Sequence, residues 1–163
     1  MNDKPNHYVD SVQMGLNPNP KRRNLADMST PPPAFTYTPQ EADQTVTTPI
    51  DLADGCELSM RESYRIGLII DFSLNEHINS HHPRYRYVRN HDVARIDCCH
   101  SEVHRHQFYS NGDKDPQYYV IRSLKDCPDQ QAAEKVIDEC YGHCYSMIMS
   151  NWEAYLERWD SWS

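Results

Sequence analysis

Alternating apolar and polar positions run through the middle of the chain and predict β-strands. In Glu62–Leu74, Tyr64, Ile66, Leu68 and Ile70 recur at every second position, which is the period of a strand with one buried face. The same period predicts further strands in Arg84–Arg89, Arg95–Cys99, Val103–Tyr109 and Tyr118–Ile121. Asn111-Gly112 separates the last two, and Asn-Gly is typical of tight turns. We therefore expect an antiparallel meander of four or five strands.

The C-terminal third changes to a helical period. Pro128-Asp129 is typical of a helix start. Beyond it, apolar residues recur at steps of three and four, at Ala133, Val136, Ile137, Cys140, Cys144, Met147, Ile148, Trp152, Tyr155, Leu156 and Trp159. One face of a long helix is therefore apolar and is expected to cover the sheet. The prediction is an α+β fold, with a four- to five-stranded antiparallel sheet packed against a long C-terminal helix.

Residues 1–57 show neither period. This segment holds eight of the eleven prolines, and proline both removes a backbone donor and fixes φ. Only 38% of the whole chain is hydrophobic, so part of it is expected not to join a core. We predict a disordered or extended N-terminal arm over residues 1–57 and a single folded domain over residues 58–163.

The apolar runs are short, and the N-terminus is polar. The run Ile66–Ile70 is too short to span a bilayer, and Met1-Asn2-Asp3-Lys4 begins no hydrophobic signal region. We expect a cytoplasmic protein with no membrane partner. The six cysteines are then expected to be reduced thiols rather than disulfides.

Charge is divided unevenly along the chain. The net charge is −8, which argues against a protein that coats nucleic acid without specificity. Between His81 and His106, however, five arginines stand against three acidic residues, whereas from Asp126 onward two basic residues stand against eight acidic ones. Anions would be attracted to the predicted strands and repelled from the helix.

Seven of the nine histidines lie between His77 and His106. Histidine titrates near neutral pH and transfers protons, and cleavage of RNA needs proton transfer and cations beside the phosphate. One interpretation is metal-independent cleavage of RNA, with His104 and His106 as acid–base groups and Asp97 orienting an imidazole. The groups expected to bind the substrate are Arg84, Arg86, Arg95, Arg105 and the ring of Tyr87.

Two other interpretations of the histidines remain open. His104 and His106 share one face of a predicted strand and could bind zinc with His100, or with Cys98 or Cys99 completing the coordination. Alternatively, the histidines are ordinary polar residues on the solvent face of a sheet. No cofactor is expected under the first interpretation, and zinc is the alternative.

An Arg-x-Asp element, Arg95 and Asp97, precedes a His-x-His element, His104 and His106. Over about residues 60–160 this order, followed by a turn, a strand and a helix, resembles small bacterial proteins of the TumE type. Those proteins are toxin components of toxin–antitoxin pairs, so the resemblance implies a toxin-like activity and a cognate antitoxin as partner. The chain differs from the pattern in its N-terminal arm and in the inserted Cys98-Cys99-His100.

Two hypotheses for function follow. The first is a toxin-like nuclease or related effector that acts on RNA with the histidine and arginine cluster. The second is a non-catalytic module that binds another protein through the acidic face of the helix, with Glu134, Asp138, Glu139 and Glu157 in the contact.

Overall fold

A computed structural model describes residues 31 and 33–161 of the chain. The rest of the predicted N-terminal arm, residues 1–30 and 32, lies outside the described residues. Within the described residues, the folded unit covers residues 34–161. Its elements are β1 (Gln44–Ala53), β2 (Cys56–Arg65), β3 (Leu68–Ile78), the short 3-10 helix η2 (Tyr85–Tyr87), β4 (Asp92–Cys99), β5 (Glu102–Gln107), β6 (Tyr119–Ser123) and α1 (Gln130–Ser161).

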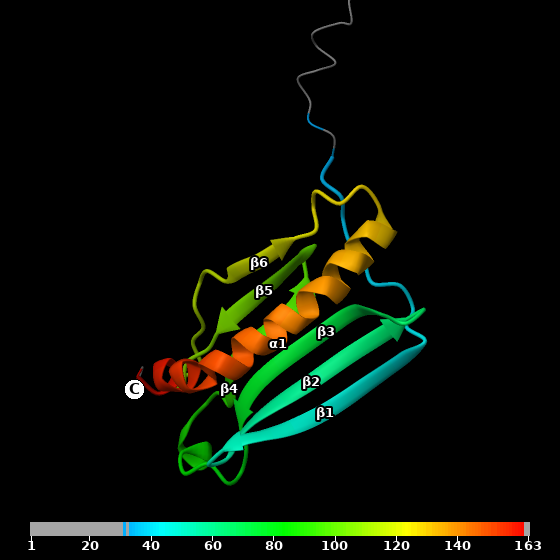
Figure 1. Cartoon of the computed structure of the whole chain (residues 1–163). Helices are drawn as coiled ribbons and strands as arrows, with labels where there is room; N and C mark the ends of the chain where they lie inside the picture. Colours follow the sequence, from blue (N-terminus) through cyan, green and yellow to red (C-terminus); the bar gives the residue numbers. More distant parts are fainter. Residues whose placement is uncertain (1–30, 32, 162–163) are drawn as a thin grey trace, which may run out of the picture. The chain divides into compact units, whose positions relative to one another are not determined.

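The fold is α+β, as the sequence patterns predict. The six strands form one antiparallel sheet in the order β1-β2-β3-β4-β5-β6, and α1 lies across one face of it (Figure 1). The meander therefore has six strands rather than four or five. One added strand is β1, which lies inside the segment 1–57 for which no regular structure was expected. A second results from the division of the predicted strand 62–74 into β2 and β3, and the predicted strand 84–89 is absent.

Two-residue turns join three of the hairpins. The turns are Asp54-Gly55, Ile66-Gly67 and His100-Ser101, and all six residues have positive φ. Positive φ at both central positions gives a turn whose twist matches that of the flanking strands. Gly55 is required sterically, because a Cβ there would lie 2.3 Å from the backbone nitrogen of His82.

The turn at Ile66-Gly67 overturns the prediction of one strand over Glu62–Leu74. The chain reverses there, so β2 ends at Arg65 and β3 begins at Leu68. Ile66 is 79% exposed although it belongs to an apolar run. Gly67 readily adopts positive φ, so it allows a tight turn inside an apolar run that otherwise predicts a single strand.

The prediction of a strand over Arg84–Arg89 is also wrong. Tyr85 N donates to the carbonyl of His82, and Tyr87 N donates to the carbonyl of Arg84. These local bonds form η2 in the connection between β3 and β4. The alternation of arginine and tyrosine in Arg84–Arg89 therefore did not indicate a strand.

The core lies between the sheet and α1, which packs mainly against β3 and β4. Helix α1 begins near the predicted start, and the Asp129 carboxylate accepts a hydrogen bond from Ala132 N at 2.8 Å, which satisfies a free N–H at the helix start. The buried side chains include Leu58, Phe72, Leu74, Ile96 and Val103 from the sheet and Ile137, Cys144, Ile148 and Trp159 from α1.

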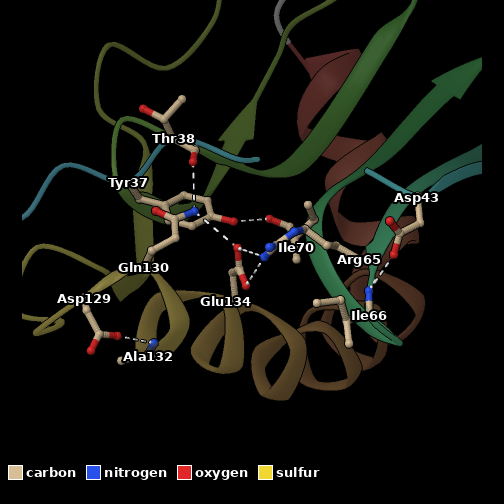
Figure 2. Close-up of polar contacts among 10 residues, drawn as sticks. All are labelled: Tyr37, Thr38, Asp43, Arg65, Ile66, Ile70, Asp129, Gln130, Ala132 and Glu134. Carbon is tan, nitrogen blue, oxygen red and sulfur yellow. Dashed lines mark hydrogen bonds and ion pairs between the residues drawn. The ribbon is translucent and has the colours of Figure 1, made fainter. Parts of the chain in front are cut away.

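The segment that precedes β1 is fastened to the sheet and to the start of α1 (Figure 2). Tyr37 is buried, and its hydroxyl donates to the carbonyl of Ile70 at 2.5 Å. Gln130 Nε2 donates to the carbonyl of Thr38 at 2.9 Å. These contacts place residues well before position 58 within the folded unit.

Glu76 is an acidic residue on the apolar face of the sheet. Its side chain is fully buried, Oε1 accepts a weak bond from the Cys56 thiol at 3.7 Å, and Oε2 has no partner among the described residues. Burial raises the pKa of the Glu76 carboxyl to about 8. The folded chain therefore retains this proton over a pH range in which the unfolded chain has lost it.

We expect Glu76→Gln to abolish a pH dependence of stability. As pH rises from the ordinary carboxyl pKa towards about 8, only the unfolded chain ionises, so the free energy of unfolding of the wild type falls. Denaturant unfolding should show that the free energy of unfolding of the wild type falls by a few kcal/mol relative to that of the variant between about pH 5 and about pH 8. The exposed Glu139→Gln is the control, and an equal pH dependence in wild type and Glu76→Gln would contradict the assignment.

Arg105 also lies on the helix side of the sheet. It pairs with Ile96 of the core across the β4–β5 ladder. Its guanidinium carbon lies 4.8 Å from the ring centroid of Tyr155 and 5.9 Å from that of Tyr119. Arg105 therefore connects α1 to the strand β6.

Arg105→Gln should lower the free energy of unfolding by about 1 kcal/mol, because it removes the cation from between two aromatic rings. Denaturant titration followed by tryptophan fluorescence would measure the change. Arg86→Gln is the matched control, since Arg86 is exposed and its loss should change stability by less than about 0.5 kcal/mol. Identical midpoints for the two variants would show that the stacking contributes nothing.

Candidate functional site

The turn His100-Ser101 sets the register of the hairpin that carries the predicted site. Cys99 pairs with Glu102 directly beside the turn. The turn is tied down from two sides, because Ser101 Oγ accepts from Tyr37 N at 2.8 Å and the Ser101 carbonyl accepts from Leu124 N at 2.9 Å.

This register brings the Arg-x-Asp and His-x-His elements together. Asp97 pairs with His104 and Arg95 pairs with His106 across the β4–β5 ladder. Ile96 belongs to the core, so its immediate neighbours Arg95 and Asp97 point to the opposite side of the sheet. That side, which α1 does not cover, is called the open face.

Nε2 of His104 is surrounded by three polar side-chain atoms. His106 Nε2 lies 2.9 Å away, Asp97 Oδ1 lies 3.3 Å away and Cys99 Sγ lies 3.5 Å away. Cys99 Sγ and Asp97 Oδ1 are 3.4 Å apart, and Arg95 Nε is 3.4 Å from Asp97 Oδ2. These residues, Arg95, Asp97, Cys99, His104 and His106, are called the His104 cluster.

The two imidazoles differ in exposure. The His104 side chain has an exposed fraction of 0%, whereas His106 is half-buried. Burial lowers the pKa of both imidazoles, and the charge of His104 lowers the pKa of His106 further. The charge of Asp97 raises the pKa of both imidazoles. The unprotonated forms are therefore favoured, and only His106 can contact a molecule from solvent.

Aromatic side chains frame the cluster. The ring of Tyr118 lies 4.5 Å from the His104 ring and 5.5 Å from the His106 ring, measured between centroids. Hydrogen bonds from Lys125 and Tyr118 lower the pKa of the buried Glu102 carboxyl. Tyr118 was not predicted as a site residue. The Val103–Tyr109 pattern carried no signal for Tyr118, because Tyr118 reaches the imidazoles from the segment just before β6.

Three residues of the cluster place donor atoms where they could hold a metal ion. The ligand atoms of Asp97, Cys99 and His104 all lie within 4.8 Å of one another. His100, one of the predicted zinc ligands, stacks on His104 with 6.4 Å between ring centroids and lies in the turn. Burial and the neighbouring Asp97 raise the pKa of the Cys99 thiol to about 11.

Four predicted substrate-binding residues lie away from the cluster. Arg105 is on the helix face. Arg84 pairs with Asp160 near the end of α1, and its guanidinium lies 5.8 Å from the Trp159 ring. Arg86 and Tyr87 are exposed in and around η2. Only Arg95 therefore brings a guanidinium to the predicted imidazoles.

Four other histidines, His77, His81, His82 and His91, lie in β3 and in the connection between β3 and β4. His77 Nε2 lies 3.3 Å from a Glu57 carboxylate oxygen on the open face, and His91 stacks on Tyr85 at 4.0 Å. His82 lies edge-on to Trp159. The histidine-rich stretch of the sequence therefore lies in two regions of the fold. One is β3 with the connection that follows it, and the other is the His104 cluster.

The acidic face proposed for protein binding is divided by the packing of α1. Glu134 is buried and pairs with Arg65 at 3.3 Å, and an Asp138 carboxylate oxygen accepts from Ile69 N at 2.9 Å. Glu139 and Glu157 are exposed. Two of the four acidic residues therefore contact the sheet.

No helix among the described residues combines the length and the apolar composition needed to cross a membrane.

Comparison with known proteins gives no relative. No model of a protein family matches the sequence, and neither a curated protein nor a solved structure matches it.

Proposed function

We propose that the protein cleaves RNA at the His104 cluster, as a toxin-like effector of the kind that the sequence resemblance implies. The observation that supports this most directly is the pairing of Asp97 with His104 and of Arg95 with His106 on one face. A carboxylate, two imidazoles and a guanidinium then lie beside one another. Proton transfer and charge stabilisation at a phosphate need these groups.

His106 is the group that would transfer a proton. Its imidazole is half-buried, and the cluster favours its unprotonated form. It would accept the proton of the ribose 2′-hydroxyl, whose oxygen then bonds to phosphorus while the bond to the 5′-oxygen breaks. The 5′-oxygen takes a proton from solvent water. The products are a 2′,3′-cyclic phosphate and a 5′-hydroxyl.

His104 would position His106 rather than touch RNA. The fully buried His104 ring is 2.9 Å from His106 through the two Nε2 atoms. A general acid and a general base on opposite sides of one phosphate would have to lie farther apart than these two Nε2 atoms, which are separated by 2.9 Å. The structure therefore changes the sequence-based hypothesis, in which both imidazoles were acid–base groups.

Arg95 and Tyr118 would hold the substrate. Arg95 is the cluster's guanidinium, it is 36% exposed, and its Nε is 3.4 Å from Asp97. The Tyr118 ring is 40% exposed beside both imidazoles, and an exposed tyrosine ring can stack on an unpaired base. These features favour single-stranded RNA over duplex.

We expect the wild-type chain to cleave single-stranded RNA oligonucleotides and His106→Ala to be slower by about 10²–10⁴-fold, because the proton acceptor is removed. Gel analysis of end-labelled oligonucleotides that together contain all dinucleotide steps would measure both rates. Oligonucleotides with 2′-deoxyribose should not be cleaved. The products should carry a cyclic phosphate, which mass spectrometry identifies.

His143→Ala is the matched control, because His143 is exposed on α1 and lies outside the cluster. It should cleave at the wild-type rate. Equal rates for wild type and His106→Ala, or no cleavage of any oligonucleotide by the wild type, would remove the proposal. Growth inhibition on expression in bacteria, lost in His106→Ala, would connect cleavage to a toxin role.

A further inference from the structure

We propose that Asp97, Cys99 and His104 bind a zinc ion, with the fourth coordination position open on the exposed side of the site. This inference deepens the proposed function, and the role of the ion in cleavage rests on that function. Binding of the ion itself rests only on the geometry of the three side chains.

Hydrogen bonding alone does not account for the atoms around His104. An imidazole nitrogen carries either one proton or one lone pair, so it makes one good hydrogen bond. Nε2 of His104 nevertheless has three polar neighbours, at 2.9, 3.3 and 3.5 Å. A carboxylate oxygen, a thiol sulfur and a buried imidazole nitrogen that all lie within 3.5 Å of one another are better explained by a shared cation.

The spacing of the donor atoms fits a tetrahedral ion. Bonds of about 2.0–2.2 Å to nitrogen and oxygen and about 2.3 Å to sulfur place tetrahedral donor atoms about 3.3–3.6 Å apart. The oxygen–nitrogen distance from Asp97 to His104 is 3.3 Å, the sulfur–nitrogen distance from Cys99 to His104 is 3.5 Å, and the sulfur–oxygen distance is 3.4 Å. All three edges fall in that range.

The donor types favour zinc among the biological divalent ions. One thiolate, one imidazole and one carboxylate suit zinc, whereas calcium and magnesium prefer oxygen atoms alone. The surrounding contacts hold the donors in place. Arg95 contacts the Asp97 carboxylate, and the Tyr118 ring lies 4.5 Å from the His104 ring, measured between centroids. Such outer contacts orient ligands in metal sites.

The fourth position faces His106. His106 Nε2 lies 2.9 Å from His104 Nε2 but is outside the group of three donors that share one small volume. An ion on His104 Nε2 would take the place of His106 as its partner. His106 would then be free beside the open position, which is where a water molecule or a phosphate oxygen would bind in a catalytic zinc site.

Metal titration of the purified full chain tests the inference without RNA. After removal of metal with a chelator, the wild type should bind one equivalent of zinc in competition with a chromophoric chelator. Cobalt(II) should give a tetrahedral visible spectrum and a thiolate charge-transfer band in the near ultraviolet. Because outer contacts alone change affinity about 10–100-fold, Cys99→Ser and Asp97→Asn should weaken zinc binding by at least about 100-fold.

Cys127→Ser is the matched control, since Cys127 is a free, partly exposed cysteine outside the cluster. It should bind zinc and cobalt as the wild type does. Cys99 is exposed, so its variant is expected to fold, and circular dichroism would verify this. Absence of stoichiometric zinc binding by the wild type, or a thiolate–cobalt band that survives in Cys99→Ser, would overturn the inference.

The two proposals fail in different ways. If zinc binds but no RNA is cleaved, the metal site stands and the nuclease proposal fails. If the chelated, metal-free wild type cleaves RNA at the full rate and binds no zinc, the nuclease proposal stands and the metal site fails.

Discussion

The pairing register of β4 and β5 is the constraint on which the site depends. Two residues with positive φ, His100 and Ser101, close this hairpin, and they place Asp97 opposite His104. A shift by one residue would turn both imidazoles of β5 to the helix side, because side chains alternate between faces. Hydrogen bonds from Tyr37 and Leu124 to Ser101 hold the turn in this register. The segment before β1 therefore contributes to a site that it does not enter.

The two faces of the sheet carry different groups of side chains. Its helix side carries the core and two polar groups with structural consequences, the buried Glu76 and the stacked Arg105. Its open face carries the His104 cluster at β4 and β5. Because the strands are fixed by packing on one side, the backbone positions of the donors on the other side are fixed as well. A rigid sheet of this kind suits groups whose spacing must match an ion or a phosphate.

Both proposals depend on the same buried atom, Nε2 of His104. His104 Nε2 is 2.9 Å from His106, which faces solvent, and within 3.5 Å of Asp97 and Cys99. In either chemistry His104 acts as the fixed centre and His106 as the group that meets the substrate. Among the predicted arginines, only Arg95 lies close enough to balance the carboxylate. The positive region expected from residue counts is therefore not a continuous surface, since its other arginines lie in η2, beside α1 or on the helix face.

The sequence by itself determined the α+β class and the long C-terminal helix, and the period within each strand placed Arg95 with Asp97 and His104 with His106. The register of β4 and β5 then brought the two pairs together. The sequence also contains the turn signal Asp54-Gly55, which the prediction of an arm over residues 1–57 did not use. Only the tertiary structure decided that His104 is buried, that Cys99 and Tyr118 join the cluster and that Arg84, Arg86, Arg105 and Tyr87 do not. The physical reason is that periodicity is local, whereas neighbours across a sheet depend on turn conformation and on hydrogen bonds between distant segments.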